Sequence, residues 1–525
     1  MQPVHRPVYN AGAMTLSKMA RLSLALASGI ALALAFPLFN LPILAWVAPA
    51  GLIIAALNQK PGFALLLGWL QGVVFYVLSV PWIYTVMRQY GPLTVPEAGG
   101  VLILVVLAAG AFHAAFACGT AWMSRSGTPR ACLAAPFSYV ALELAILHVP
   151  DVGFPWNLLG YAAAGNLAFV QLTTLTGIYG LSFVVAAFNA LTAWGVIEAA
   201  RRNRRALGVW FGAAGVLLAI ASVGPRFVPQ EKPDRVAHLV QTNFPQALSY
   251  PDNWMDLHSA ELDQLEQISV AAAQKNPGLV VWPEAPAPFS LEYTWFLPRV
   301  LRIARNAGNN FLLGIVDWKP PSNGHANATN SAALLDSYGA LNFTYDKIHL
   351  VPFGEYVPWR KWITFAGKLT ADIGDFQRGT EYKVGRLPGG RFGVFICYEA
   401  IFPNEVRRFT SGGAELLINI SNDGWFGGSA APAQHLAMAR VRAVENRRWL
   451  LRDTNNGITV SVDPYGRIVA RMPANVRGEL DAPYGFRSDL TQYARWGDWF
   501  PWMCVFAALV LLLWSAAGAP AHRIS

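Results

Sequence analysis

Charged side chains are scarce in this sequence. Only 14% of the 525 residues are Asp, Glu, Lys or Arg, whereas 54% are hydrophobic. So low a charge content excludes a wholly soluble protein, and the length exceeds that of one ordinary domain. We therefore expect a membrane protein that carries a soluble part.

Hydrophobic runs long enough to cross about 30 Å of hydrocarbon form a large group near the N-terminus and one run near the C-terminus. The eight predicted spans cover roughly residues 19–39, 41–57, 62–84, 97–123, 131–149, 169–199, 205–224 and 497–518. The first run could instead belong to a cleaved signal peptide, because a basic start precedes it and Ala31-Leu32-Ala33 resembles a cleavage site. The charge pattern of the connections favours eight spans.

Positive charge is in excess, with a formal net charge of +9, which is typical of proteins that bind nucleic acid or a membrane surface. Basic residues precede the first run and follow the second, fourth and sixth, as Lys60, Arg125 and Arg201 illustrate. The positive-inside rule then predicts cytoplasmic N- and C-termini and puts the segment after about residue 225 on the opposite side. Topology explains the basic excess, so we expect no nucleic-acid partner.

Cysteine is rare as well, with four in the chain. Cys118, Cys132 and Cys504 lie in or beside predicted spans, which leaves Cys397 as the single cysteine of the soluble segment. A lone cysteine after an apolar run is more often a small buried hydrophobe than a nucleophile. An unpaired thiol in an oxidising compartment is unusual, however, and this favours chemistry at Cys397.

The soluble segment, about residues 234–485, alternates between strand-like and helix-like stretches, which predicts an α/β layer fold. We expect strands at 236–244, 278–285, 311–318, 391–399 and 415–423, and helices at 253–273, 297–307 and 435–448. Turn signals at 456–457 and 463–466 predict an antiparallel meander near the end. The Ser- and Asn-rich stretch 321–331 is predicted to be a flexible loop.

Three side chains of this segment could carry chemistry: Glu284, Lys347 and Cys397. Glu284 and Cys397 fall at predicted strand ends, where functional groups of α/β sheets gather. A thiol attacks only as the thiolate, so it needs a base, which a carboxylate can supply. A fixed ammonium can stabilise both the thiolate and the oxyanion that forms when a carbonyl is attacked. Each residue alone is a weak signal, since each also has an ordinary structural interpretation.

The motifs around these residues strengthen the hypothesis. WPE at 282–284, K-x-H-L-V-P-F-G-E at 347–355 and CYE at 397–399, in this order on an α/β segment, resemble the nitrilase superfamily. With seven predicted spans before the segment and one after it, the whole chain resembles the apolipoprotein N-acyltransferase family. Five further segments carry the same resemblance: GFPWNLLGY (153–161), QTNFPQ (241–246), ISNDGWFG (420–427), QHLAMARVRAVENRR (434–448) and TNNGIT (454–459).

The resemblance implies a fold with two parts. These are a multi-pass α-helical membrane domain with eight transmembrane helices and a nitrilase-like α-β-β-α sandwich. Residues 1–225 would form the N-terminal membrane domain, 226–490 the extracytoplasmic catalytic domain, and 491–525 the C-terminal span with a short cytoplasmic tail. The implied location is a bacterial inner membrane, with the catalytic domain on the periplasmic side.

The resemblance also implies an activity. Such enzymes move an acyl chain from a membrane phospholipid to the α-amino group of the diacylglyceryl-modified cysteine at the start of an apolipoprotein. The bilayer would hold both substrates, and no cofactor or metal is expected. By motif, Cys397 would become the thioester, Glu284 would act as general base and acid, and Lys347 would stabilise the oxyanion. Glu355 would support this triad, while Tyr398 and Glu399 would shape the site.

Two other functions stay open at this stage. A membrane-tethered nitrilase-type amidase would use the same triad and release the acyl group to water. A non-catalytic scaffold or transporter would keep an inactive domain, which the intact Glu284, Lys347 and Cys397 argue against. His349 and His435 show no metal-ligand spacing, so structural or substrate-shaping roles are expected for them.

Several features bear on lipid contacts rather than on the reaction. The sequence departs from the family pattern at Ile348, at Ser249-Tyr250 and at Ile146. Aromatic residues in 357–365 and 421–428 could touch acyl chains or simply pack. Glu143 is an ionisable residue at membrane depth and therefore a functional candidate, unless it reaches the nearby interface.

Overall fold

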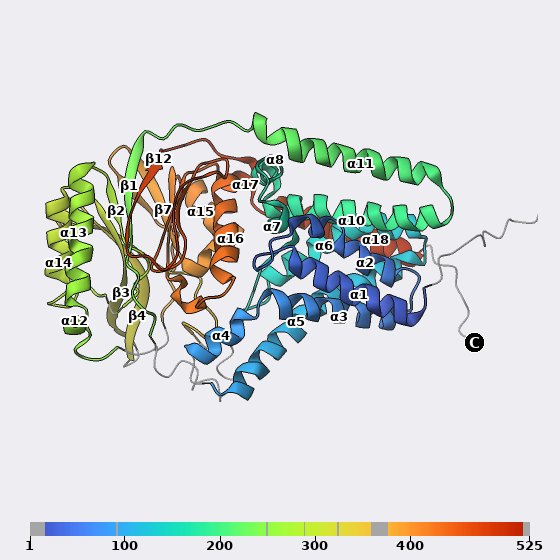
Figure 1. The fold of residues 1–525 in the computed structure, drawn as a ribbon, viewed down its shortest axis with the longest axis horizontal. Coiled ribbons are helices and arrows are strands. Elements are labelled where there is room, and N and C mark those ends of the chain that lie inside the picture. The colour runs from blue at the N-terminus through green and yellow to red at the C-terminus, as the bar shows by residue number, and fades with distance from the viewer. Residues whose placement is uncertain are drawn as a thin grey trace, which may run out of the picture.

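The protein consists of a helical bundle and a sandwich of two β-sheets that lie end to end (Figure 1). The computed structural model describes residues 16–90, 93–247, 250–287, 289–322, 325–356, 358 and 376–517. The bundle contains both ends of the described chain, and the strands of the sandwich lie between Arg235 and Tyr484.

The bundle is built from apolar helices joined by short turns. In chain order its α-helices are α1 (Lys18–Leu34), α2 (Ala48–Ala56), α3 (Pro61–Ser79), α4 (Trp82–Gln89), α5 (Val95–Ser124), α6 (Thr128–Leu147), α7 (Leu159–Ala163), α8 (Leu167–Val170), α9 (Thr173–Thr176), α10 (Ile178–Ala200), α11 (Arg204–Val223), α17 (Gln492–Trp496) and α18 (Trp499–Ala517). Two 3-10 helices, η1 (Pro42–Trp46) and η2 (Gly224–Phe227), complete it.

Six helices of the described residues are long and apolar enough to cross a membrane, fewer than the eight spans predicted. They are Pro61–Ser79, Val95–Ser124, Thr128–Leu147, Ile178–Ala200, Arg204–Phe227 and Trp499–Ala516. The two remaining predictions fall on shorter helices, because α1 has 17 residues and the second run is divided into η1 and α2.

The sixth predicted span, 169–199, is also interrupted. Gly177 has φ of +65°, in the left-handed region that glycine adopts without a steric cost, and it separates α9 from α10. A side chain at this glycine would also collide with the ring of Tyr493. The continuous span therefore begins only at Ile178.

The sandwich contains two six-stranded sheets, in the orders β12-β1-β2-β3-β4-β5 and β11-β10-β9-β8-β7-β6. The first six strands are β1 (Arg235–Gln241), β2 (Leu279–Val281), β3 (Phe311–Ser322), β4 (His325–Leu335), β5 (Leu341–Asp346) and β6 (Val384–Leu387). The others are β7 (Gly390–Ile396), β8 (Leu416–Ser421), β9 (Leu450–Thr454), β10 (Thr459–Val462), β11 (Ile468–Met472) and β12 (Gly478–Tyr484). The five strands and the meander predicted from the sequence are confirmed, with β9, β10 and β11 antiparallel in turn.

Helices cover both outer faces, which produces the predicted α-β-β-α layering (Figure 1). One layer contains α12 (Trp254–Leu257), α13 (Ser259–Lys275) and α14 (Leu297–Ala307). The other contains α15 (Pro403–Ser411) and α16 (Ala431–Asn446) and lies between the sheets and the bundle. Short 3-10 helices η4 (Cys397–Ile401) and η5 (Asp423–Phe426) follow β7 and β8.

Parallel strands at the centre of each sheet bring several strand ends together. β1, β2 and β3 run parallel in one sheet, and β7, β8 and β9 run parallel in the other. One expectation about this region is wrong: the stretch 321–331 is not a loop, because most of it belongs to β4, which pairs with β3 and β5. Asn330 and Ser331 of this strand form buried hydrogen bonds with Glu284 and Asp346, respectively.

Helix α16 joins the sandwich to the bundle. Its Gln434 side chain accepts hydrogen bonds from the indoles of Trp156 at 2.7 Å and Trp82 at 3.3 Å, and donates to the carbonyl of Ser79 at 2.9 Å. Further along the helix, the Arg442 guanidinium donates to the hydroxyl of Tyr161 at 2.8 Å. Buried polar groups must find partners, so these bonds dock α16 in one position on the bundle.

Candidate active site

Cys397 lies directly after β7, where the strand ends and η4 begins. Its φ is +50°, a conformation that few residues other than glycine adopt and that recurs at functional sites. The residue is only 6% exposed, and its carbonyl lies 3.0 Å from Nε2 of His435. Burial and the nearby Glu284 raise the pKa of the thiol, while Lys347 opposes them, so the resting sulfur carries its proton.

Lys347 follows β5 and points into the space between the two sheets. Its side chain is 1% exposed, and Nζ lies 3.1 Å from Oε1 of Glu284 and 2.9 Å from Oε1 of Glu355. Burial alone would lower the pKa of this ammonium, but the two carboxylates outweigh that effect and raise it well above its usual value. Lys347 is therefore a permanent positive charge in a buried site.

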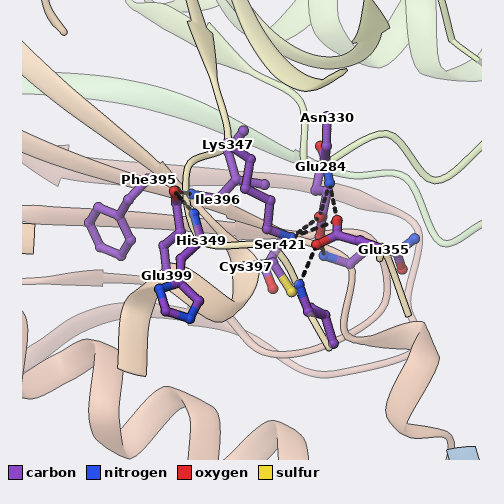
Figure 2. Close-up of polar contacts among 12 residues, drawn as sticks. Glu284, Asn330, Lys347, His349, Glu355, Phe395, Ile396, Cys397, Glu399 and Ser421 are labelled. Carbon is purple, nitrogen blue, oxygen red and sulfur yellow. Dashed lines mark hydrogen bonds and ion pairs between the residues drawn. The ribbon is translucent and has the colours of Figure 1, made fainter. Parts of the chain in front are cut away.

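Glu284 lies three residues beyond the end of β2 and points at the same group (Figure 2). Its Oε1 accepts a bond from Nδ2 of Asn330 at 2.7 Å, and its Oε2 accepts one from the backbone N–H of Asn422 at 2.7 Å. Figure 2 shows the sulfur of Cys397 beside this carboxylate and the Lys347 ammonium. The three residues singled out in the sequence thus lie together, although more than one hundred positions separate Glu284 from Cys397.

Glu355 and Asn330 hold the ammonium and the carboxylate in place. One oxygen of Glu355 accepts from Lys347 and from Asn330 at 2.8 Å, and the other accepts from the backbone N–H of Val351 at 2.8 Å. Glu355 was expected to support the site, whereas Asn330 was missed because its segment was interpreted as a loop. A strand assignment for β4 would have placed Asn330 on the sheet beside Lys347.

Glu399 is tied into the backbone on either side of the site rather than open to a substrate. Its oxygens accept from the N–H groups of Ile396 at 2.7 Å and Ile348 at 2.8 Å and from the hydroxyl of Tyr345 at 2.7 Å. Burial raises its pKa to about 7, although these bonds act in the opposite direction. Glu399 therefore links the residues beside Lys347 to the strand that ends at Cys397.

Tyr398 faces the helical bundle. Its ring packs against those of His349 and Phe402, with centroids 5.8 and 5.3 Å apart, and its hydroxyl donates to the carbonyl of Gly153 at 3.4 Å. His349 in turn lies 2.8 Å from Glu405. These neighbours place Tyr398 where the site meets the bundle.

A second buried network, not foreseen as part of the site, holds the backbone of Cys397. His435 lies 3.2 Å from Asp423, which forms an ion pair with Arg452 at 2.8 Å, and all three side chains are fully buried. Ser421, the last residue of β8, donates to Asp423 at 2.8 Å. The sequence carried a signal for this network, because polar residues follow the end of β8 just as Cys397 follows the end of β7. Their partners could not be identified from the sequence, because these lie at distant positions in the chain.

The aromatic loop 421–428 packs on the bundle. Phe426 lies 5.1 Å from Trp82 and 6.0 Å from Trp156, and Trp425 lies 5.5 Å from Tyr90, measured between ring centroids. Their contacts therefore agree with the packing interpretation of this loop. The other candidate loop, 357–365, lies outside the described residues apart from Pro358.

Glu143 is buried inside the helical bundle. It is 4% exposed, and its Oε1 accepts from the backbone N–H of Leu159 at 2.7 Å. The side chain lines a small cavity of about 30 Å³ with His113, Tyr139 and Trp156. Glu143 is therefore separate from the Glu284–Lys347–Cys397 cluster.

The cluster has the parts of an acyl-transfer site. A thiol at a strand end, a carboxylate beside it and a fixed ammonium are the three groups that nucleophilic attack on a carbonyl needs. A lysine ammonium has three donors, and the described residues occupy two of them here, which leaves one for an incoming oxygen.

Comparison with known proteins assigns both parts of the chain. Residues 28–191 match the family model for the apolipoprotein N-acyltransferase N-terminal domain, and residues 240–482 match the model for carbon-nitrogen hydrolases. The second match confirms the nitrilase-like sandwich.

Similar proteins extend over nearly the whole chain. An apolipoprotein N-acyltransferase from Geobacter metallireducens is 34% identical over 93% of this chain and 94% of its own. One from Azotobacter vinelandii is 34% identical over 95% of each chain.

Two solved structures are similar to about half of the chain. An amidase from Nesterenkonia sp. shares 20% identity and covers 50% of this chain and 94% of its own, with a TM-score of 0.35. Nit3 from Saccharomyces cerevisiae shares 21% identity and covers 48% of this chain and 89% of its own, with a TM-score of 0.37. Because relatives at 34% identity match almost end to end, this chain belongs to the apolipoprotein N-acyltransferase family, within the nitrilase superfamily.

Proposed function

We propose that this protein transfers a fatty acyl chain from a membrane phospholipid to the α-amino group of the N-terminal diacylglyceryl-cysteine of apolipoproteins. One observation carries the chemical part of the proposal. A buried ammonium, Lys347, lies between Glu284 and Glu355 and beside the thiol of Cys397 in a chain of this family. Cys397 is the proposed nucleophile, Glu284 the general base and acid, and Lys347 the oxyanion stabiliser.

The first half-reaction forms a thioester. Glu284 takes the proton of the Cys397 thiol, and the sulfur attacks the carbonyl carbon of a phospholipid ester. The Lys347 ammonium stabilises the negative oxygen of the tetrahedral intermediate. The carbon–oxygen bond then breaks, Glu284 returns the proton to the leaving oxygen, and a lysophospholipid departs.

The second half-reaction forms an amide. The α-amino group of the acceptor attacks the thioester carbonyl, and Glu284 accepts a proton from the nitrogen. Lys347 again stabilises the oxyanion. The carbon–sulfur bond breaks, and the sulfur regains a proton from Glu284, so that the resting site is restored with no net gain or loss of protons at the enzyme.

The supporting residues have proposed roles as well. Glu355 orients the ammonium, Glu399 positions the strand end that carries Cys397, and Tyr398 shapes the side of the site that faces the bundle. Their contacts support these roles, because each of the three side chains connects the cluster to a backbone group or a ring nearby.

The chain is a bacterial membrane protein, and we propose eight crossings of the inner membrane with the sandwich in the periplasm and both termini in the cytoplasm. α1 and the pair η1–α2 would supply the two crossings beyond the six long helices. α1 alone spans about 26 Å at the usual rise per residue. The connection between α10 and α11, with Arg201, Arg202 and Arg204, lies at the end of the bundle far from the sheets, which supports this orientation (Figure 1).

This topology divides the chain into three proposed parts. Residues 1–225 form the membrane domain, 226–490 the catalytic domain, and 491–525 the last crossing and tail. The phospholipid donor and the lipid-modified acceptor would both reach the site from the bilayer. The bundle surface therefore has to admit lipid next to Tyr398.

Mass spectrometry of the intact protein tests the proposal. After incubation with phospholipid, the wild type is expected to gain the mass of one fatty acyl group, and Cys397→Ala to gain none. Cys118→Ala is the matched control, because this cysteine lies in α5 of the bundle, and it should gain the acyl group normally. Addition of a diacylglyceryl lipopeptide should then yield a peptide heavier by one acyl chain.

Two outcomes would contradict the proposal. Release of free fatty acid without any acylated peptide would indicate a hydrolase with the same three residues. An acyl adduct that persists in Cys397→Ala would move the nucleophile elsewhere.

A further inference from the structure

A cluster of possible metal ligands lies on β1 and β12, away from the residues assigned to acyl transfer. His238 pairs directly with Asp481 across the two antiparallel strands, and Glu479 is two residues from Asp481 on the same face of β12. Nδ1 of His238 lies 2.9 Å from Oε1 of Glu479 and 3.1 Å from Oδ1 of Asp481. The three ligand atoms lie within 4.8 Å of one another.

The imidazole is oriented as a metal-binding histidine would be. Its Nε2 lies 2.6 Å from the backbone carbonyl of Asn276, and a carbonyl only accepts hydrogen bonds, so Nε2 carries the hydrogen. Metal-bound histidines usually donate their second N–H to a carbonyl or carboxylate in this way. The Nδ1 lone pair then faces the two carboxylates. Nδ1 and the carboxylate oxygens are all acceptors, so they repel one another at this distance unless a cation or a proton lies between them.

Charge favours a divalent ion at this point. Among the described residues, Glu479 and Asp481 form ion pairs with His238 alone. A protonated His238 would leave the group with a net charge of about −1, whereas a neutral imidazole with a divalent cation sums to zero. Asn276 also ends α13, so the carbonyl end of that 17-residue helix adds negative potential beside the cluster.

The distances are close to those of a coordinated ion. Nitrogen and oxygen ligands lie about 2.0–2.2 Å from Zn²⁺, so two ligands of a tetrahedral ion are about 3.4 Å apart. Nδ1 of His238 is 2.9 and 3.1 Å from the two carboxylate oxygens, so the side chains need to separate by only a few tenths of an ångström to admit the ion. His238 is fully buried, while the side chains of Glu479 and Asp481 are 20% and 53% exposed. One side of the cluster is therefore open to solvent, from which an ion and its remaining water ligands can come.

We propose that His238, Glu479 and Asp481 bind one divalent transition-metal ion, with Zn²⁺ as the expected occupant in solution. One imidazole and two carboxylates suit this class of ion better than Mg²⁺ or Ca²⁺, which prefer oxygen ligands alone. The ion joins the edge strand β12 to β1, and β12 is the last strand before α17 and α18. Its role is to stabilise the sandwich at the point where the chain returns to the bundle.

Titration calorimetry and thermal unfolding of the purified full-length protein test the site. The protein is freed of metal with a chelator, and the Cys397→Ala background is used because a thiol can bind Zn²⁺ by itself. We expect one Zn²⁺ per chain and a higher unfolding temperature when Zn²⁺ is added. His238→Ala, Glu479→Gln and Asp481→Asn should each weaken binding by at least about tenfold, since the loss of even an outer partner costs that much.

His258→Ala is the matched control, because His258 forms a similar surface contact with a single carboxylate, Glu261, at 3.3 Å. This variant should bind Zn²⁺ as the parent does. Equal binding by the parent and by Glu479→Gln and Asp481→Asn, whose exposed side chains can change without unfolding the protein, would overturn the proposal. Absence of a Zn²⁺-dependent rise in the unfolding temperature would do the same.

Discussion

At the scale of single residues, the protein keeps a lysine charged in a buried site. Lys347 could be singled out in the sequence by its motif, but its two carboxylate partners could not be read from spacing. Glu284 comes from the end of β2 and Glu355 from the segment after β5. Only their convergence keeps the ammonium charged while one of its three donors stays available for an incoming oxygen.

Removal of this charge should slow the chemistry far more than it disturbs the sheet. Lys347→Met is expected to reduce the rate of acyl-enzyme formation by about 10²–10³-fold, the usual effect of losing one oxyanion-stabilising group. The measurement is the time course of the acyl adduct by mass spectrometry. Lys319→Met is the control, because Lys319 also bridges two carboxylates of the same sheet, Asp317 and Asp346, but is 32% exposed and remote from the thiol. A similar loss of rate in both variants would show that lysine bridges matter for folding and not for the reaction.

At the scale of elements, the site depends on strand ends that are held by buried polar groups. The network of His435, Asp423 and Arg452 connects α16, η5 and β9 with the carbonyl of Cys397. The elements themselves were predictable, since apolar strand runs and the helical pattern of α16 are local properties of the chain. The network was not predictable, because the sequence does not show which polar residues at the strand ends face each other across the sandwich.

The acid stability of the protein should depend on Asp423. Burial alone would raise the pKa of this carboxyl, but Arg452 and His435 outweigh it and lower the pKa well below the usual 3.8. The folded carboxylate thus stays charged where the unfolded one takes up a proton. Its contribution to stability is complete above about pH 4 and is lost as the pH falls below that value.

Asp423→Asn is therefore expected to lower the free energy of unfolding near neutral pH by about 3 kcal/mol, since it leaves Arg452 buried without its partner. The variant should also lose less stability than the wild type between pH 4 and lower values. Denaturant unfolding followed at several pH values measures both effects. Asp256→Asn, an exposed carboxylate of α12, should behave as the wild type, and an equal pH dependence in Asp423→Asn would contradict the assignment.

At the scale of the whole molecule, the sandwich is docked on the bundle by α16 and by the aromatic loop after β8. The site is built in the sandwich, and the hydrogen bond from Tyr398 to the carbonyl of Gly153 joins it to the bundle. In the proposed reaction both substrates are lipids, so a site on this side of the sandwich would lie next to the bundle from which they arrive. The orientation of the molecule in the membrane follows from the proposed eight crossings.

Accessibility labelling tests that orientation. Single cysteines are introduced at Tyr338, which is 81% exposed in the sandwich, and at Arg202, between α10 and α11, in a background without the four native cysteines. An impermeant thiol reagent added to intact cells with a permeable outer membrane should label position 338 and not position 202. Labelling of position 202 under these conditions, or of position 338 only after cell lysis, would reverse the topology.

The sequence by itself determined that the chain has an apolar helical part and an α/β part, because hydrophobic runs and strand periodicity are local. It also determined which three residues could react, because their motifs are intact. Only the tertiary structure decided that the sixth span breaks at Gly177, that 321–331 contributes a strand carrying Asn330, and that His435 and Asp423 hold the backbone of Cys397. These features depend on contacts between residues far apart in the chain, and burial, which favours a partner for each polar group, exists only once the sheets and helices have packed.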